Sequence, residues 1–419
     1  MSVDIGFSGI SPSEKINKYR EKEDNSNVGI GIDIINNCNA RCPTCYYEHF
    51  DDLSLDRVMS PEKIKRIIDQ SAENGFSELY LLGGEPSIYP LELLTDIIRY
   101  AKEKMKLVLM VTNGLIFEDE EYCKKIMQTG VSLSVQKHTI VSGIESSEEL
   151  FRKRNLENVR FGINTGFEKT KKAFENIEKY FDPKNISIQC SITRDVVEHH
   201  DLLEIFMYAR KKEYNIIIEC VRPSMKFLRG NKQDLTPEEL TKIFLLLQKI
   251  DQAFFPHLKP YFLIPPAYGF PCTLPKTGIH VLINGDVNPC VGQPYKLGNI
   301  FSQNLKEILE NPARDFFRFP EKRIVGYCSK CKYLEFCTGG CRGESYDSTG
   351  NSQGSVGCFN ASAIQCPEEE RLEKIKNNGL SVNDILPENC DGCLLKGDGK
   401  CRLNPEIVEN VIKSYIKKN

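Results

Sequence analysis

The chain of 419 residues contains 40% hydrophobic and 27% charged residues and has a formal net charge of −3. This composition is typical of a globular protein, of roughly two to three domains at this length, and the small net charge gives no general attraction to nucleic acids or anionic membranes. The sequence shows neither a signal-peptide pattern nor an apolar run of bilayer length, so we expect a cytoplasmic protein with no membrane or nucleic-acid partner. In that compartment the 17 cysteines would stay reduced, and their clustering points to metal binding.

Residues 1–27 are polar and of mixed charge and are expected to form a lead-in segment. From residue 28 to 235, short apolar runs alternate with amphipathic helical patterns, which predicts parallel βα units. The predicted strands are Val28–Ile35, Glu78–Leu82, Lys106–Val111, Val131–Val135, Ile186–Ile192 and Asn215–Cys220. The predicted helices are one that begins after Ser60 and stops at Gly75, and Leu91–Lys104, Asp119–Gln128, Lys169–Tyr180 and Leu202–Lys212. The segment Val159–Ile163 fits either a seventh strand or an insertion.

A cysteine cluster, Cys38, Cys42 and Cys45 in a Cys-x3-Cys-x2-Cys pattern, follows the first predicted strand. Three thiolates bind three irons of a four-iron cluster and leave the fourth iron open to an outside ligand. Taken alone, the cysteines would also fit a zinc loop. The pattern resembles the signature of radical S-adenosylmethionine (radical SAM) enzymes. The resemblance implies that the open iron binds the amine and carboxylate of the methionine moiety, and that one electron then cleaves the sulfonium to a 5'-deoxyadenosyl radical.

The second predicted strand ends in the turn Gly83-Gly84-Glu85-Pro86. Glycines allow a ligand to approach the backbone closely, and a carboxylate can accept a hydrogen bond from an ammonium group. In radical SAM enzymes a turn of this sequence holds the methionine amino group. Its position after the cysteine cluster favours that family over a zinc loop. The resemblance implies an α/β fold, a partial (β/α)6 radical SAM barrel over residues 28–235.

Further contacts to the cosubstrate are implied by the same resemblance. Thr112 and Asn113 end the third predicted strand, and Ser134 lies near the end of the fourth, where a ribose contact is common. Tyr47, just after the cysteine cluster, would cover the adenine. Thr112 and Ser134 would equally fit ordinary strand ends. Gln136 stands where relatives usually carry an aspartate.

After a predicted helical linker at 236–271, the composition shifts to Gly, Pro and Cys. The cysteines of this region are Cys272, Cys290, then Cys328-x2-Cys331-x5-Cys337-x3-Cys341, and Cys358. This order resembles the SPASM domain, an extension of radical SAM enzymes that binds auxiliary four-iron clusters. It implies such a domain, with a small β-hairpin and helices, over 272–365.

The resemblance assigns Cys272, Cys290 and Cys341 to auxiliary cluster I, and Cys328, Cys331, Cys337 and Cys358 to auxiliary cluster II. Cluster I is then one ligand short, so it is either open to substrate or ligated from elsewhere in the chain. A zinc ribbon would account only for the four cysteines from 328 to 341.

The extension 366–419 carries four more cysteines, which are Cys366, Cys390, Cys393 and Cys401. They fit a third auxiliary cluster, a zinc site, a donor to auxiliary cluster I or reduced surface thiols. The remaining cysteines, Cys123, Cys190 and Cys220, lie in helix or strand patterns and are expected to be small buried apolar residues.

These motifs lead to one functional hypothesis. The resemblance implies S-adenosylmethionine and three four-iron clusters as cofactors, with a further cluster or zinc ion in the extension, and an electron donor such as flavodoxin or ferredoxin. The enzyme would abstract a hydrogen from its substrate, most often a peptide or protein side chain that gains a thioether, a carbon–carbon crosslink or an oxidised group. No catalytic acid or base can be identified from the sequence.

Two alternatives stay open. The first is a radical SAM enzyme that oxidises or epimerises a small molecule such as an aminoglycoside or another sugar. Residues 1–28 are too short for the leader-binding domain that many peptide-modifying relatives carry, but sulfatase maturases lack that domain too, so this does not decide between the two substrate classes. The second is a non-catalytic iron–sulfur electron carrier or zinc scaffold. The turn at residues 83–86 argues against this second alternative, since a carrier has no need to bind methionine.

Overall fold

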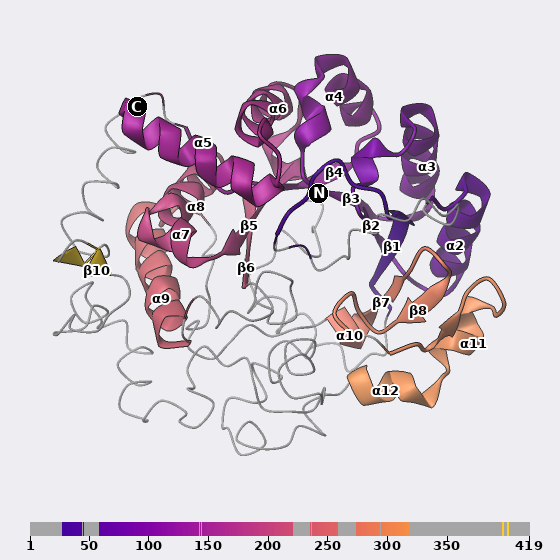
Figure 1. Ribbon diagram of the computed structural model, residues 1–419. Helices are drawn as coiled ribbons and strands as arrows, with labels where there is room; N and C mark the ends of the chain where they lie inside the picture. Colours follow the sequence, from indigo (N-terminus) through magenta and orange to yellow (C-terminus); the bar gives the residue numbers. More distant parts are fainter. Residues whose placement is uncertain are drawn as a thin grey trace.

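The six strands predicted for the amino-terminal part form one curved parallel sheet in the computed structural model of the protein (Figure 1). The structure describes residues 27–43, 45, 58–141, 143, 145–220, 235, 237–258, 274–293, 295–318, 396–397 and 400–401. The strands are β1 (Gly29–Ile35), β2 (Glu78–Gly83), β3 (Leu107–Thr112), β4 (Ser132–Gln136), β5 (Ile186–Ile192) and β6 (Asn215–Cys220). Each pairs in parallel with the next one in the chain, as the alternation of strand and helix patterns predicted.

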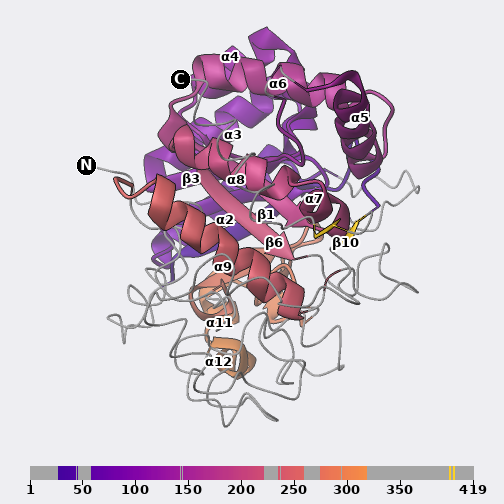
Figure 2. The ribbon, with the colours of Figure 1, turned by 90° about the vertical axis from the view of Figure 1, so that its left-hand side faces the viewer.

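Helices connect these strands, because parallel neighbours require a crossover. They are α2 (Pro61–Glu73), η2 (Pro86–Ile88), α3 (Leu91–Lys104), η3 (Leu115–Glu118), α4 (Glu120–Met127), α5 (Ser147–Phe161), α6 (Gly166–Tyr180), η4 (Pro183–Asn185), α7 (Arg194–Glu198), α8 (Asp201–Lys211) and α9 (Pro237–Phe254). The long helices lie along the outer side of the curved sheet (Figure 1), and Figure 2 shows α8 and α9 side by side next to β6. Helix α2 begins as predicted, with the Ser60 side chain accepting a hydrogen bond from the Lys63 N–H.

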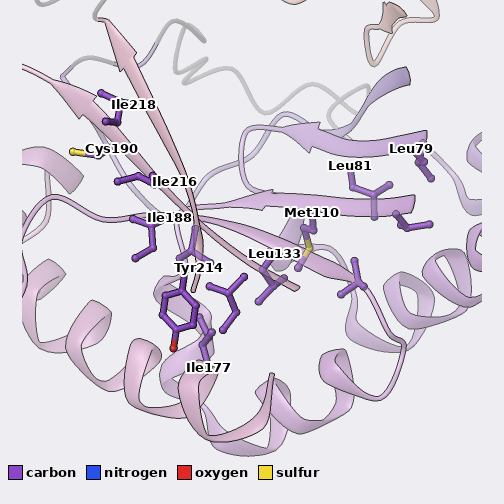
Figure 3. Packing of buried hydrophobic residues seen from close by; sticks show 14 of the residues in the cluster. Leu79, Leu81, Met110, Leu133, Ile177, Ile188, Cys190, Tyr214, Ile216 and Ile218 are labelled. Atoms are coloured by element: carbon purple, nitrogen blue, oxygen red, sulfur yellow. The ribbon is translucent and has the colours of Figure 1, made fainter. Parts of the chain in front are cut away.

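Alternation along the strands separates an apolar outer face from the inner face of the sheet. On β1, Ile30, Ile32 and Ile34 are fully buried in the core, whereas Gly31 lines a cavity on the other side, as the two-residue period of a strand requires. Figure 3 shows the same core farther along the sheet and labels, among others, Leu79, Leu81, Met110, Leu133, Ile188 and Ile216. The helices therefore cover one face, and the other face is left for a site.

The carboxyl-terminal part adds three short strands to the same sheet. They are β7 (Gly278–Val281), β8 (Asp286–Asn288) and β9 (Gly298–Asn299), accompanied by α10 (Leu274–Thr277), α11 (Leu305–Leu309) and α12 (Pro312–Arg318). Strand β7 pairs in parallel with β1, and β8 and β9 continue antiparallel. Within the described residues the sheet thus has nine strands, in the order β6-β5-β4-β3-β2-β1-β7-β8-β9. The predicted hairpin is present as β7 and β8, but its attachment to β1 was not predicted.

The segment Val159–Ile163 is not a strand. Its first residues form the end of α5, and Gly162, at φ 62°, caps that helix in the left-handed conformation. The strand interpretation was wrong because Val159 is 63% exposed on a helix, and α5 itself was not predicted. By contrast, Cys123 and Cys190 are buried as predicted, and α9 lies in the predicted helical linker. The side chain of Cys220 lies outside the described residues.

A further antiparallel pair, β10 (Lys396–Gly397) with β11 (Lys400–Cys401), lies in the carboxyl-terminal extension. The domain boundaries predicted at residues 236, 272 and 366 fall outside the described ranges and stay predictions. Among the helices that the structure describes, none combines the length and the apolar character needed to cross a membrane.

Candidate functional site

A cavity of about 290 Å³ lies on the inner face of the sheet, at the carboxyl ends of β1 to β5. Its size is near the lower end of the range for ligand pockets, about 300–1,000 Å³. Ten residues that the sequence predicted for a site line this cavity, and they are Cys38, Cys42, Cys45, Gly83, Gly84, Glu85, Thr112, Asn113, Ser134 and Cys290. Ligands of open α/β sheets bind outside the carboxyl ends of the strands, so the convergence of these separate segments marks a candidate site.

The two glycines of the turn after β2 allow it to pack on the chain that leads into the cysteine cluster. A Cβ atom on Gly83 would lie 2.1 Å from the carbonyl oxygen of Ile35, and one on Gly84 would lie 2.3 Å from that of Asn37. The N–H of Gly84 donates to the Ile35 oxygen (2.7 Å), and that of Glu85 donates to the Asn37 oxygen (2.9 Å). From the sequence, these glycines are expected to allow a ligand to approach the backbone. The contact that requires them here is with the protein's own backbone.

Glu85 is the centre of a buried hydrogen-bond network at the ends of β2 and β3. Its carboxylate accepts hydrogen bonds from the Thr112 hydroxyl (2.6 Å), the Asn113 N–H (2.7 Å) and the Ser87 N–H (3.0 Å). Burial raises the pKa of Glu85, and these donors oppose the rise. Pro86 begins η2 directly behind it. Thr112, predicted as a contact to the cosubstrate, therefore also orients the glutamate.

The loop that carries the cysteines is held by segments far away in the sequence. The N–H of Arg41 donates to the carbonyl oxygen of Phe161 at the end of α5 (2.7 Å), and a Cβ on Gly162 would lie 2.2 Å from the Arg41 oxygen. On the other side, Asn113 Nδ2 donates to Asn39 Oδ1 (2.7 Å). Because α5 was not predicted, this half of the support for the loop was missed.

The three cysteine thiols of this loop influence one another. Burial raises the pKa of Cys38 to about 11, with a further rise from the Glu85 charge. Burial also raises the pKa of Cys42 to about 12, and the next causes are Cys38 and Cys45. In the described part of the chain no three such side chains are close enough to hold a single metal ion. A four-iron cluster takes thiolate ligands, and the three thiols on one cavity are a donor set of that chemistry.

The cavity wall at the end of β4 is polar and supported from α5. The Ser134 hydroxyl donates to Gln189 Oε1 (3.3 Å), and Gln136, His138 and Arg160 line the cavity beside it. The Ser134 hydroxyl, expected to contact a ribose, is thus engaged with a side chain of β5.

Behind this wall lies Glu157 of α5, which is fully buried. It accepts hydrogen bonds from the backbone N–H groups of His138 (3.2 Å) and Thr139 (3.0 Å), and its carboxylate lies 3.6 Å from Lys137 Nζ. Burial by itself would raise its pKa, but the Lys137 charge and His138 outweigh it and hold the pKa at about 2. Burial lowers the pKa of His138, so a neutral imidazole faces the cavity at neutral pH.

The opposite wall comes from the carboxyl-terminal part of the chain. Ile279, His280, Cys290 and Val291 line the same cavity as the first three cysteines. They reach it because β7 continues the sheet beside β1. Cys290, predicted to bind an auxiliary cluster, is therefore on the same cavity as the predicted radical SAM cluster.

Several predicted site residues lie outside the described residues. They are Tyr47, Cys272, Cys328, Cys331, Cys337, Cys341, Cys358, Cys366, Cys390 and Cys393. Cys401 forms part of β11, and its side chain is likewise not described. The arrangement of these residues stays a prediction.

Comparison with known proteins adds to this geometry. Residues 32–203 match the family profile of the radical SAM superfamily, and residues 272–332 match that of SPASM, an iron–sulfur cluster-binding domain. The first match contains the cysteine cluster and the turn after β2. The second contains the β7–β8 hairpin and Cys290.

Individual relatives and structures cover most of the chain. It is 24% identical to the cysteine-type anaerobic sulfatase-maturating enzyme of Clostridium perfringens, over 73% of this chain and 86% of the relative. It is 27% identical to the AdoMet-dependent heme synthase of Methanosarcina barkeri, over 77% of this chain and 93% of the relative. The solved structure of native anSMEcpe with bound AdoMet and Cp18Cys peptide superposes with a TM-score of 0.62 at 19% identity, over 84% of this chain and 99% of that chain. The solved structure therefore shares the fold described above.

Proposed function

The chain belongs to the radical SAM superfamily and carries a SPASM iron–sulfur cluster-binding domain, and on that premise we propose that it uses S-adenosylmethionine to abstract a hydrogen atom from a peptide or protein side chain. The observation that carries this proposal is the convergence of Cys38, Cys42, Cys45 and the Glu85 turn on one cavity. An electron carrier or zinc scaffold would not need a cavity beside its cysteines.

In this proposal Cys38, Cys42 and Cys45 would hold a four-iron cluster, which would supply one electron for the cleavage of S-adenosylmethionine to methionine and a 5'-deoxyadenosyl radical. The protein's own residues position the parts. The turn at residues 83–86 binds the methionine amino group, and Thr112 and Asn113 keep its glutamate in place. Ser134 and Tyr47 contact the nucleoside.

The SPASM region would contribute further clusters. We assign Cys272, Cys290 and Cys341 to auxiliary cluster I, Cys328, Cys331, Cys337 and Cys358 to auxiliary cluster II, and Cys366, Cys390, Cys393 and Cys401 to a third cluster or a zinc site. The position of Cys290 on the cavity wall supports a role of cluster I beside the substrate. Flavodoxin or ferredoxin would deliver the electrons.

A peptide substrate is favoured by the relatives. One of them is named as a sulfatase-maturating enzyme, and a structure with the same fold contains a peptide. The second candidate is a small-molecule substrate, which the heme synthase relative supports. The thioether, carbon–carbon crosslink or oxidised group that the reaction would form is decided by the substrate.

The test begins with protein purified without oxygen and reconstituted with iron and sulfide. After addition of reductant and S-adenosylmethionine, 5'-deoxyadenosine is quantified for the wild type, for Cys45→Ala and for Cys190→Ala. Cys190 is buried in the core away from the cavity, so it is a matched control. We expect product from the wild type and the control, and a loss of at least about 100-fold in Cys45→Ala.

Peptides with deuterium on their Ser or Cys side chains then test the substrate class. Transfer of deuterium into 5'-deoxyadenosine supports a peptide substrate. Transfer only from labelled sugars or tetrapyrroles would favour the small-molecule candidate. No 5'-deoxyadenosine from any mixture, with the clusters intact by spectroscopy, would favour an electron carrier.

A further inference from the structure

A buried imidazole–carboxylate pair lines the cavity wall that the carboxyl-terminal part supplies. His280 Nε2 lies 2.8 Å from Asp33 Oδ1, and the side chains are 3% and 1% exposed. The two residues are 247 positions apart in the sequence and meet because β7 pairs in parallel with β1. His280 belongs to the lining of the cavity that also contains the cysteine cluster.

The position opposite His280 in the sheet leaves room for its ring. Gly31 pairs with His280 in the register of β1 and β7. A Cβ on Gly31 would lie 3.2 Å from His280 Cδ2 and 2.7 Å from Leu82 Cδ1. A larger residue at position 31 would push the imidazole away from its place over the inner face of β1.

The pairing with Asp33 determines what the other ring nitrogen can do. A carboxylate only accepts hydrogen bonds, so Nε2 carries the proton in the neutral ring and Nδ1 has a lone pair. Nδ1 is buried and has no hydrogen-bond partner among the described residues. A buried acceptor without a partner costs free energy, and most buried polar groups do have partners. A ligand that donates a hydrogen bond would satisfy it.

We propose that His280 accepts, through Nδ1, a hydrogen bond from the hydroxyl or thiol of the substrate residue, and that Asp33 is the positioning residue that fixes its tautomer. This inference rests on the proposed function and deepens it. It names serine, threonine or cysteine as the class of substrate residue, because an alkyl side chain has no donor for Nδ1. Ile279 and Val291, on the same wall, exclude water and strengthen such a bond.

The test measures binding to the reconstituted holoenzyme without oxygen. Three pools of fluorescent short peptides share randomised flanks and differ only in the central residue, which is serine, cysteine or alanine. Anisotropy titrations give a dissociation constant for each pool. We expect the wild type to bind the serine and cysteine pools roughly tenfold more tightly than the alanine pool, the size of one buried hydrogen bond.

Two variants remove the acceptor in different ways. In Asp33→Asn the amide donates to Nε2, so the ring proton moves to Nδ1 and the acceptor is lost at unchanged side-chain volume. In His280→Gln the amide NH2 still donates to Asp33, and the acceptor that remains, Oε1, lies at another position than Nδ1. The control is His257→Gln, which changes an exposed histidine outside the cavity. Thermal midpoints and iron content confirm that each variant is folded and loaded.

The inference is supported if the preference for serine and cysteine disappears in both variants, persists in the control, and the affinity for the alanine pool stays the same throughout. It is overturned if the preference persists in the variants, or if the wild type binds all three pools equally, and in both cases the peptide proposal still stands. If the variants bind all three pools equally more weakly, the inference is also overturned, because the His280–Asp33 pair would then only link β7 to β1. No binding of any pool to the wild type would contradict the peptide proposal, and the inference would fall with it.

Discussion

The backbone N–H of Asn113 donates a hydrogen bond to the Glu85 carboxylate over 2.7 Å. The same residue donates through its side chain to Asn39, inside the cysteine loop, and accepts from the N–H of Leu115. Asn113 thus connects the end of β3 to both the cysteine loop and the turn after β2. Cys45 and Glu85 are 40 positions apart in the chain. Asn113 contacts the cysteine loop through its side chain and Glu85 through its backbone, and so holds the two motifs in a common geometry.

Replacement of Asn113 should weaken this connection. In Asn113→Ala the backbone bond to Glu85 remains, but Asn39 and the Leu115 N–H lose their partner, which costs about 1–3 kcal/mol of stability. We expect lower iron content after reconstitution and slower formation of 5'-deoxyadenosine. The control is Asn185→Ala, since Asn185 bonds Ser132 at the opposite ends of the strands. Equal iron content and rate in the two variants would contradict this role for Asn113.

The glycines of the turn after β2 should tolerate no side chain. In Gly84→Ala the new Cβ would lie 2.3 Å and 2.5 Å from the carbonyl oxygens of Asn37 and Asn36, so the turn or the cysteine loop must move. We expect a loss of about 2–4 kcal/mol in the free energy of unfolding. Gly75→Ala serves as the comparison, because Gly75 has a φ of 81° but no atom within 4 Å of an added Cβ. It should cost about 1 kcal/mol. Similar urea midpoints for the two variants would show that the close contact carries no cost.

Acid should destabilise the protein in part through Glu157. Its pKa is held at about 2 in the folded state, below the ordinary 4.5, so its contribution to stability is present above pH 4.5 and is lost as the pH falls toward 2. Between pH 6 and pH 4 this amounts to about 1 kcal/mol. We expect the urea midpoint of the wild type to fall more over this interval than that of Glu157→Gln, although the variant is less stable at pH 6 because Lys137 loses its counter-charge. Parallel pH profiles would mean that Glu157 does not carry this dependence.

Removal of the Cys290 thiol should affect the formation of 5'-deoxyadenosine and the conversion of the substrate to different extents. Cys290→Ala leaves the loop at residues 38–45 unchanged, so 5'-deoxyadenosine should still form at a rate within about threefold of the wild type. Conversion of the substrate should decrease at least about tenfold, because the wall of the cavity that Cys290 forms is altered. Cys123→Ala, in the buried face of α4, is the control. If Cys290→Ala abolishes 5'-deoxyadenosine formation, the two sets of cysteines depend on each other more closely than the proposal states.

Much of the amino-terminal fold could be predicted because its signals are local. Alternation of apolar residues in β1, apolar periodicity in α2 and the Ser60 cap depend on neighbours only a few residues away. The cysteine spacing and the turn after β2 are likewise short motifs with their own chemistry, and the structure places both on one cavity. Helix α5 was missed because its buried face includes Lys153, Glu157 and Arg160, so the apolar periodicity of an ordinary surface helix is absent.

What the sequence by itself determined is therefore the six strands β1 to β6 and the short motifs that lie within the radical SAM and SPASM profile matches. Only the tertiary structure decided which distant segments surround them. The support of the cysteine loop by the end of α5, and the placement of His280 against Asp33, depend on contacts between residues more than 100 positions apart. The physical reason is that pairing of β7 with β1 depends on backbone hydrogen bonds, which are alike for almost every residue, so no local pattern in either strand specifies its partner.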